Sequence, residues 1–150
     1  MTLTYRAATA ADLPFIVRLS VEGSVLATKD DVTAFDPRYA AAFAAIDNDP
    51  NHELWIVERD GVPAGSFQLS YIPGIPNLGG WRGLIENVQV DSAQRGGGIG
   101  GEMMRFAIER CRERGCWVVQ LTSNKQRLDA HRFYDRLGFV ATHEGYKLHL

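Results

Sequence analysis

The sequence predicts an open α/β sheet with both antiparallel and parallel connections, elements in the order βααβββαβαββ and helices on both faces. Segments in which apolar residues alternate are interleaved with segments in which they recur at helical spacing. Clusters of glycine, proline and asparagine separate these segments. The chain has 150 residues, of which 45% are hydrophobic and 23% are charged, and this suits one domain with one core. We therefore expect residues 1–150 to form a single domain.

The first half of the chain is expected to hold a strand, two helices and a hairpin of two strands, over residues 3–8, 13–20, 38–46, 53–58 and 64–72. Capping residues at 9–12 begin the first helix, and Asp-Asn-Asp-Pro at 47–50 ends the second. Arg-Asp-Gly-Val-Pro at 59–63 forms the turn of the hairpin.

The second half is expected to begin with a loop at residues 73–80. It continues as strand, helix, strand, helix and two strands, over residues 83–91, 99–114, 117–122, 128–137, 139–141 and 146–150. The helix at 99–114 has one apolar face, made by Ile99, Met103, Ala107, Ile108 and Cys111. Gly115 ends this helix, and Gly138 ends the next one.

Composition excludes several classes of function. The formal net charge of −2 argues against general binding to nucleic acid or to an anionic membrane, since both need a basic surface. No apolar run approaches the roughly 20 residues of a membrane span, and residues 1–4 begin no signal peptide. Cys111 and Cys116 fit neither a disulfide framework nor a metal site. We therefore expect a cytoplasmic protein without nucleic-acid, membrane or metal partners.

A run of glycines lies between the strand at 83–91 and the helix at 99–114. From Gly96 to Gly101, five of six residues are glycine, and each costs roughly 0.5–1 kcal/mol relative to alanine in regular structure. Such a run is expected where backbone N–H groups must come close to a ligand. Because the run opens a helix, whose N-terminus attracts anions, phosphate is the favoured ligand.

Two nucleotide-binding motifs fit this run poorly. Gly96, Gly98 and Gly101 match the spacing of a dinucleotide-binding fingerprint, but the next predicted strand, at 117–122, carries no acidic residue for the ribose. A Walker loop requires lysine where Glu102 stands. The third interpretation is a strand–loop–helix in which the backbone at 95–100 wraps a pyrophosphate.

At this point the chain resembles the GNAT superfamily of acyl-CoA-dependent N-acyltransferases. The resemblance rests on Glu-Asn-Val-Gln-Val-Asp at 86–91, Gln-Arg-Gly-Gly-Gly-Ile-Gly at 94–100 and Ala-His-Arg-Phe-Tyr-Asp-Arg-Leu-Gly-Phe at 130–139. Two separated motifs at the family's usual distance are far more specific than either alone. The resemblance implies the GNAT type of open mixed sheet, with acetyl-CoA as co-substrate and no metal.

The resemblance also implies that the pyrophosphate of CoA lies on the amides of the glycine run and that the pantetheine arm bonds to the strand at 83–91. The residues so implied in cofactor binding are Val88, Gln89, Val90, Arg95, Gly96, Gly97, Gly98, Ile99, Gly100, Gly101 and Asn124. The family often has asparagine seven residues before its tyrosine, where this chain has Arg127. One contact with pantetheine is therefore left open, and Arg127 is either a phosphate ligand or a solvated residue at a helix start.

Two residues are candidates for catalysis. The family commonly uses a tyrosine at the position of Tyr134 to protonate the departing CoA thiolate; the alternative is a tyrosine that completes the apolar face of its helix. Glu86 has the strand parity of Val88 and Val90 and so interrupts an apolar face, and similar acyltransferases often carry a general base at this strand. A bulge in this strand would turn Glu86 to another direction. If Glu86 is not the base, Glu22 or a water chain is the alternative.

The acceptor side is less specified by the sequence. In the resembling family it is built from the segment between the first two helices and the loop before the glycine-motif strand, here residues 25–35 and 71–82. Phe35, Tyr71 and Trp81 are the candidates for lining a pocket there. The compact chain favours a small-molecule amine. The identity of the acceptor, the use of other acyl groups and the oligomeric state are left open, although dimers are common among similar proteins.

The sequence therefore predicts an N-acetyltransferase that moves an acetyl group from acetyl-CoA to a primary amine of a small molecule by direct attack in a ternary complex. An acetyltransferase acting on a protein or peptide amine is one alternative. A catalytically silent CoA-binding sensor or interaction module is another. The least favoured hypothesis is a nucleotide-dependent oxidoreductase, which would bind NAD in preference to CoA.

Overall fold

The computed structural model describes residues 2–25 and 27–150. Two residues, Met1 and Leu26, lie outside the described residues. Met1 belongs to the segment that was expected to begin no signal peptide, and Leu26 belongs to the expected acceptor segment. The chain divides into two compact units, Met1–Gln120 and Leu121–Leu150. The first unit contains the whole sheet, and the second contains one helix.

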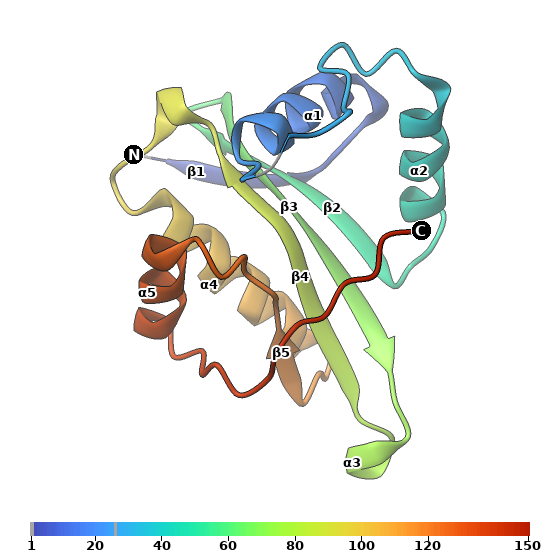
Figure 1. Cartoon of the computed structure of the whole chain (residues 1–150), viewed down its shortest axis with the longest axis vertical. Coiled ribbons are helices and arrows are strands. Elements are labelled where there is room, and N and C mark those ends of the chain that lie inside the picture. Colours follow the sequence, from blue (N-terminus) through green and yellow to red (C-terminus); the bar gives the residue numbers. More distant parts are fainter. Residues whose placement is uncertain (1, 26) are drawn as a thin grey trace. The chain divides into compact units, whose positions relative to one another are not determined.

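The first unit is built on a five-stranded sheet whose strands follow one another in sequence order (Figure 1). Its strands are β1 (Leu3–Ala7), β2 (His52–Arg59), β3 (Val62–Pro73), β4 (Trp81–Val90) and β5 (Val118–Gln120). Strands β1 to β4 pair antiparallel, whereas β4 and β5 are parallel. The mixed α/β sheet expected from the sequence is confirmed. Strand β5 is shorter than the buried strand predicted at 117–122 because it pairs with β4 over only three residues.

Helices cover both faces of this sheet. Helices α1 (Leu13–Glu22) and α2 (Pro37–Asp47) lie on one face, and α4 (Ile99–Glu113) lies on the other (Figure 1). All three agree with the predicted helices to within about two residues at each end, the usual uncertainty of such boundaries. The predicted loop at 73–80 contains a short four-residue turn, α3 (Pro76–Gly79), in which Asn77 and Leu78 have φ angles of +59° and +60°. Among the described residues, no helix has the length and apolar character needed to cross a membrane.

Helix α4 packs on the sheet through an aromatic cluster. The ring of Phe106 stacks on Tyr5 of β1 with a centroid distance of 3.9 Å. It also meets Trp55 of β2 and Phe67 of β3 edge-on, at 5.0 and 6.2 Å. Most of the predicted apolar face of this helix is buried, namely Ile99, Met103, Ala107 and Cys111, while Ile108 is half-buried. The amphipathic pattern therefore identified the face that meets the sheet.

Two strand glycines allow the helix to come close. A Cβ on Gly65 of β3 would lie 2.8 Å from the carbonyl oxygen of Gln89 in β4 and 3.0 Å from the end of the Met103 side chain of α4. A Cβ on Gly83 of β4 would collide with the sulfur of Cys111. Burial raises the pKa of the Cys111 thiol to about 12, so it stays a neutral core residue, as the sequence predicted. Cys116, half-buried, is also a free thiol.

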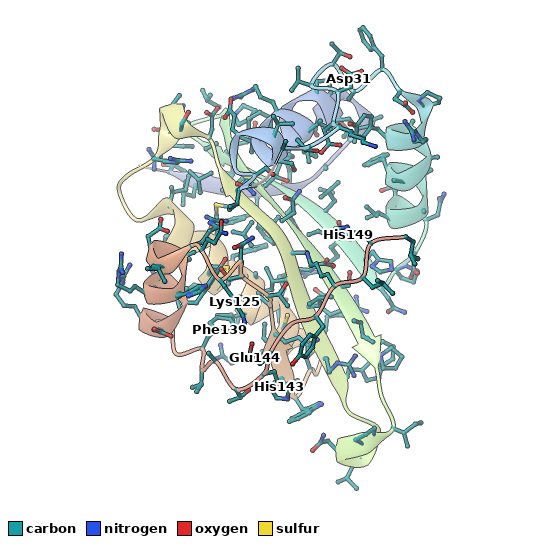
Figure 2. All side chains as sticks on the ribbon, in the orientation of Figure 1. Asp31, Lys125, Phe139, His143, Glu144 and His149 are labelled. Carbon is teal, nitrogen blue, oxygen red and sulfur yellow. The ribbon has the colours of Figure 1, made fainter. Side chains whose placement is uncertain are left out.

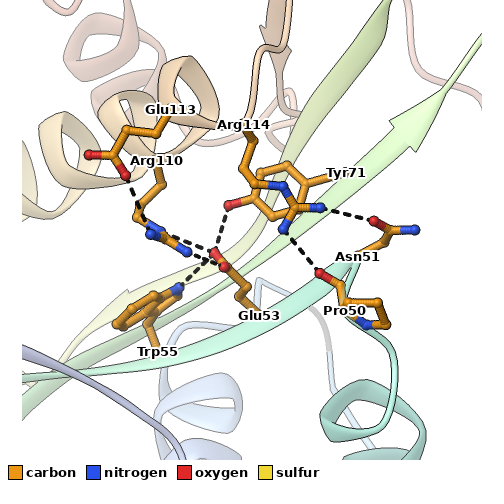
Figure 3. A network of polar contacts seen from close by, with 8 residues as sticks. All are labelled: Pro50, Asn51, Glu53, Trp55, Tyr71, Arg110, Glu113 and Arg114. Carbon is orange, nitrogen blue, oxygen red and sulfur yellow. Dashed lines mark hydrogen bonds and ion pairs between the residues drawn. The ribbon is translucent and has the colours of Figure 1, made fainter.

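A polar network fastens the C-terminal half of α4 to β2 and β3 (Figure 3). The carboxylate of Glu53 accepts hydrogen bonds from Arg110, from the Tyr71 hydroxyl at 2.6 Å and from the Trp55 indole at 3.2 Å. The guanidinium of Arg110 also lies over the Trp55 ring, 5.3 Å from its centroid. Arg114 lies over the Tyr71 ring at 4.0 Å and donates to the turn that precedes β2. The helix is therefore held by charge as well as by apolar packing.

The second unit, Leu121–Leu150, contains helix α5 (Leu128–Arg136). Tyr134 of this helix packs edge-on against Phe133 and Phe139, with centroid distances of 5.3 and 6.0 Å. Lys125 forms an ion pair with Glu144 at 3.1 Å, and both residues are labelled in Figure 2. The helix predicted at 128–137 is confirmed.

The two strands predicted at 139–141 and 146–150 are wrong, because no residue there is in a strand. A strand needs a neighbour that pairs with its backbone N–H and C=O groups, and none of the described strands pairs with these residues. Their alternating apolar side chains, Tyr146, Leu148 and Leu150, are fully or almost fully exposed. Alternation is the pattern of a strand, but it does not supply the partner.

We expect Glu53→Gln to destabilise the protein at neutral pH and much less in acid. Burial alone would raise the pKa of Glu53, but hydrogen bonds from Arg110, Tyr71 and Trp55 outweigh it and hold the pKa below its ordinary value. A carboxyl whose pKa folding lowers adds stability above its unfolded pKa and loses that stability as the pH falls through its folded pKa. Removing the charge leaves Arg110 without its main partner, at a cost of roughly 1–3 kcal/mol.

Denaturant unfolding at pH values from neutral to acid measures the difference in the free energy of unfolding between the variant and the wild type. Glu113→Gln is the matched control, because Glu113 pairs with the same Arg110 at 3.4 Å but is exposed, and exposed pairs are worth less than about 1 kcal/mol. A Glu53→Gln penalty that is the same in acid as at neutral pH would contradict the role of this charge.

Candidate functional site

The glycine run follows β4 and forms the N-terminus of α4. Gly96, Gly97 and Gly98 have φ angles of +100°, +66° and +75°, a backbone conformation that residues with a Cβ rarely adopt. Gly98 is the N-cap residue of α4, and no side chain of the described residues caps this end of the helix. The N–H groups of the first turn have no partner within a helix, so here they are left available to a ligand.

The loop is open on its outer side. A Cβ placed on Gly96 or Gly98 would meet no atom within 4 Å, and residues 95–98 are exposed. Ile99 is buried and anchors the start of the helix in the core, while Gly100 and Gly101 complete the half-buried first turn. We call residues 95–101 the glycine cradle. Residues 95–98 are exposed at the uncapped N-terminus of the helix, an arrangement that suits a phosphate or diphosphate.

Arginine side chains add positive charge beside the cradle. Arg95 is exposed at its start, and Nη2 of Arg59, at the end of β2, donates to the carbonyl oxygen of Gly96 at 2.7 Å. The nearby carboxylate of Asp91 is already paired with Arg18 of α1 at 3.1 Å. The hydrogen bond from Arg18 holds the pKa of Asp91 below its ordinary value. Residues 2–25 and 27–150 contain no cluster of three His, Cys, Asp or Glu side chains suited to a metal ion.

Next to the cradle, β4 has an unpaired edge. Strand β4 pairs with β5 only from Arg82 to Leu84, but it continues to Val90. From Ile85 onward, the edge of β4 that follows β5 therefore has no strand partner among the described residues. A ligand that carries amide groups can bind such an edge by making the hydrogen bonds of an added strand. Val88, predicted to bind the cofactor through its backbone, lies on this segment.

A β-bulge in β4 sets the direction of Glu86. Gln68 pairs with Glu86 and Ser66 pairs with Gln89, so two steps along β3 match three along β4. Asn87 takes up the extra residue with a φ of +52°, a left-handed conformation that asparagine tolerates. Because Ser66 and Gln68 point to the same face of β3, Glu86 and Gln89 share one face of β4.

The bulge corrects the parity inferred for Glu86 from the sequence. The side chain of Gln89 reaches Gly23 at the end of α1, so the shared face is the one that α1 covers. Val90 pairs with Gly65 on the opposite face, beneath α4. Glu86 therefore does not interrupt the face of Val90. The side chain of Glu86 is exposed. It lies on the face of the sheet that α1 covers, from which the chain continues toward α2.

The three residues predicted to line an acceptor pocket are not brought together. Phe35 is 85% exposed on the segment between α1 and α2. Tyr71 lies within β3 rather than in a loop, and it is 2% exposed with its hydroxyl bonded to Glu53. Trp81 is partly exposed at the start of β4. Both the ring and the hydroxyl of Tyr71 are engaged in the packing of α4 by partners distant in sequence, Arg114 and Glu53.

Tyr134 and Asn124 belong to the second unit. Tyr134 is half-buried, and its hydroxyl has no hydrogen-bond partner among the described residues. Burial raises the pKa of Tyr134, and the charge of Arg127 only partly opposes this. The side-chain oxygen of Asn124 accepts from the N–H of Gln126 at 2.9 Å, and its carbonyl oxygen lies 2.9 Å from a ring nitrogen of His131. Asn124 therefore orders the turn that precedes α5.

Sequence reasoning missed two residues of this site. Arg59 was assigned to the turn of a hairpin, yet it extends β2 and holds the cradle. Asn87 was read only as part of a motif, yet it forms the bulge. A local signal existed for Asn87, since asparagine is one of the few residues that accept a left-handed backbone. No local pattern predicts the contact of Arg59, which joins residues 37 positions apart.

Comparison with known proteins identifies relatives of this chain. Residues 24–139 match the model of the acetyltransferase (GNAT) family. The aminoalkylphosphonate N-acetyltransferase of Salmonella typhimurium is 31% identical over 138 residues, which cover 92% of this chain and 85% of that protein. The glucosamine 6-phosphate N-acetyltransferase of Trypanosoma brucei brucei is 36% identical over 86 residues, 57% of this chain and 56% of that one. A crystal structure of a transcriptional regulator from Bacillus halodurans superposes with a TM-score of 0.90 at 40% identity, over 99% of this chain and 100% of that one.

Gly98→Ala is expected to weaken the binding of CoA about tenfold, because a side chain at a φ of +75° costs roughly 1–2 kcal/mol and favours a loop that turns its N–H groups elsewhere. Gly115, at the other end of α4, also has a φ of +75° and no atom within 4 Å of its Cβ position. Gly115→Ala is therefore the matched control. Thermal unfolding should show a similar decrease in Tm for the two variants, whereas calorimetric titration should show weaker binding of CoA to Gly98→Ala alone. Equal affinities of the two variants for CoA would contradict the proposal that the glycine cradle binds CoA.

Proposed function

The chain belongs to the acetyltransferase (GNAT) family, and we propose that it transfers an acetyl group from acetyl-CoA to a primary amine of a small molecule. The observation that carries the proposal is the position of the glycine cradle at the end of the unpaired edge of β4. The cradle offers N–H groups to a diphosphate, and the edge offers peptide groups to an amide-bearing arm. CoA has these two groups in the same order, followed by the sulfur that carries the acetyl group.

This arrangement gives the donor a direction. With the diphosphate on the cradle, the pantetheine arm runs from Val90 toward the bulge at Asn87. The acetyl group then reaches the part of β4 where Glu86 turns to its exposed face. A backbone N–H near Val88 would hold the oxyanion that forms on the thioester carbonyl. Holding donor and amine at one place makes the step effectively unimolecular, which contributes much of the acceleration.

Acetyl transfer needs a base for the amine and an acid for the sulfur. The substrate ammonium gives one proton to Glu86, directly or through water, and the neutral nitrogen attacks the thioester carbonyl. Collapse of the tetrahedral intermediate breaks the C–S bond and expels the CoA thiolate, which takes the proton of the Tyr134 hydroxyl. The tyrosinate then recovers a proton, directly or through water, from the nitrogen of the new amide. Because burial raises the pKa of Tyr134, the phenol keeps its proton at neutral pH until the thiolate forms. No described residue competes for that hydroxyl.

The acceptor proposed for this chain is the class of small molecules with a primary amine. Two relatives are named for such compounds, an aminoalkylphosphonate and glucosamine 6-phosphate. Phe35 and Trp81 are both exposed and stay the proposed contacts, although the structure does not bring them together. Tyr71 was also a candidate contact, but its buried ring and bonded hydroxyl favour a packing role.

We expect the protein to release CoA thiol from acetyl-CoA only when an accepted amine is present. A thiol-detecting assay with a panel of aminoalkylphosphonates, hexosamine phosphates, simple amines and peptides measures this, beside calorimetry with acetyl-CoA, CoA and NAD. Binding of acetyl-CoA without thiol release from any amine would instead identify a silent CoA-binding module. Best turnover on peptides would move the acceptor to that class, and a preference for NAD would overturn the proposal.

Tyr134→Phe is expected to lower kcat about a hundredfold, within the range that a general acid contributes, and to leave the KM for acetyl-CoA nearly unchanged. Tyr146→Phe is the control, since Tyr146 is an exposed tyrosine of the same unit. Full turnover in Tyr134→Phe would end its assignment as the acid.

Glu86→Gln is expected to lower kcat, because the substrate ammonium loses its proton acceptor. An unchanged kcat in Glu86→Gln would place the base elsewhere, for example at Glu22.

A further inference from the structure

Arg59 is an arginine with an unusual set of partners. It is the last residue of β2, and its Nη2 donates to the carbonyl oxygen of Gly96 at 2.7 Å. Within residues 2–25 and 27–150, no carboxylate forms an ion pair with it, in contrast to Arg18 and Arg110. Its Nε is buried and has no hydrogen-bond partner among the described residues. A buried donor without a partner opposes folding, so the position of this guanidinium calls for a reason other than stability.

The contact with Gly96 fixes the direction of one N–H group of the cradle. A peptide unit is planar and trans, so its C=O and N–H point in opposite directions, and the described chain has no cis peptide. When Arg59 holds the carbonyl of Gly96, the N–H of Gly97 must point away from β2. Glycine reaches many backbone conformations, so nothing in the glycine run itself would keep this peptide in one orientation.

The same contact adds charge at the right place. The guanidinium carries a positive charge, and no carboxylate of the described residues forms an ion pair with it. It therefore raises the potential behind the cradle, on the side opposite to the N–H of Gly97. An anion in the cradle gains from an oriented N–H and from this charge, and both contributions are stronger for a doubly charged diphosphate than for a neutral ligand.

We propose that Arg59 is a positioning residue for the donor: by holding the Gly96 carbonyl, it aims the Gly97 N–H at the diphosphate of acyl-CoA. The inference rests on the proposed function, because it takes the ligand of the cradle to be that diphosphate. Arg59 itself touches the backbone of the loop and not the reacting atoms. Its effect therefore belongs to donor binding and leaves the chemical step unchanged.

The test compares two donors. Acetyl-CoA has the diphosphate, and S-acetylpantetheine has the same thioester and amide arm without it. Arg59→Met, which keeps most of the aliphatic stem, is expected to raise the KM for acetyl-CoA about tenfold or more, the value of one hydrogen bond to a charged group. The kcat with acetyl-CoA and the kcat/KM with S-acetylpantetheine are expected to stay at wild-type values. A merely structural role would lower activity with both donors.

Arg105→Met is the matched control for charge. Arg105 lies in the first turns of α4, is exposed, and pairs with Glu102 at 2.9 Å without contacting a loop carbonyl. Its loss is expected to change the KM for acetyl-CoA less than threefold. A loss equal to that of Arg59→Met would show that net charge alone acts, and it would overturn the inference.

Two further measurements keep the outcome clear. If Arg59→Met folds poorly, Arg59→Lys is used instead. It keeps the charge but not the guanidinium, so it is expected to show a smaller loss that is still selective for acetyl-CoA over S-acetylpantetheine. Wild-type protein that binds neither acetyl-CoA nor CoA in calorimetry would overturn the proposed function and this inference together. Wild-type protein that binds acetyl-CoA, with an unchanged affinity in the Arg59 variants, would overturn only the inference.

Discussion

The close approach of α4 to the sheet is the constraint on which the candidate site depends. The glycine cradle includes the first turn of this helix, so any shift of the helix moves the N–H groups that face the ligand. The approach is set by the ring of Phe106 among aromatic rings of three strands and by two strand residues without side chains, Gly65 and Gly83. Close-packed interiors tolerate little change in volume. The helix is therefore held in one position on the sheet and cannot slide along it.

A single extra residue in β4 determines which face of the sheet each of the neighbouring side chains lies on. Without the bulge at Asn87, Glu86 would lie on the face of Val90, beneath α4, where an unpaired carboxylate is strongly disfavoured. With the bulge, Glu86 is exposed on the face of α1, while Val90 still packs toward the helix. Bulges commonly re-aim side chains next to active sites. Backbone geometry at Asn87 and in the cradle, rather than a cluster of reactive side chains, thus defines the candidate site of the first unit.

The sequence predicted those features whose signals are local. Helix α4 was predicted because its apolar spacing and the glycines that flank its two ends are local signals. The glycine run is also a local signal, and Gly96, Gly97 and Gly98 have positive φ angles. Two C-terminal strands were predicted from alternation alone, and alternation does not reveal whether a neighbouring strand exists. The burial of Tyr71 depends on Glu53 and Arg114, which are distant in sequence. Partners of this kind are set by the fold, and a single sequence does not record them.

Strand β2 shows how such distant contacts combine. Near its start, Glu53 bonds to Arg110 in the last turns of α4, and at its end Arg59 bonds to Gly96, just before the helix begins. The strand from Glu53 to Arg59 spans roughly 20 Å, and the helix from Ile99 to Arg110 spans roughly 17 Å. Because these lengths match, one strand holds both ends of the helix and opposes both sliding and rotation. Strand β2 has none of the residues proposed to contact donor or acceptor, yet it fixes where the cradle lies relative to the free edge of β4. A change in its length or bend would therefore separate the two halves of the donor site even with every donor-binding residue in place.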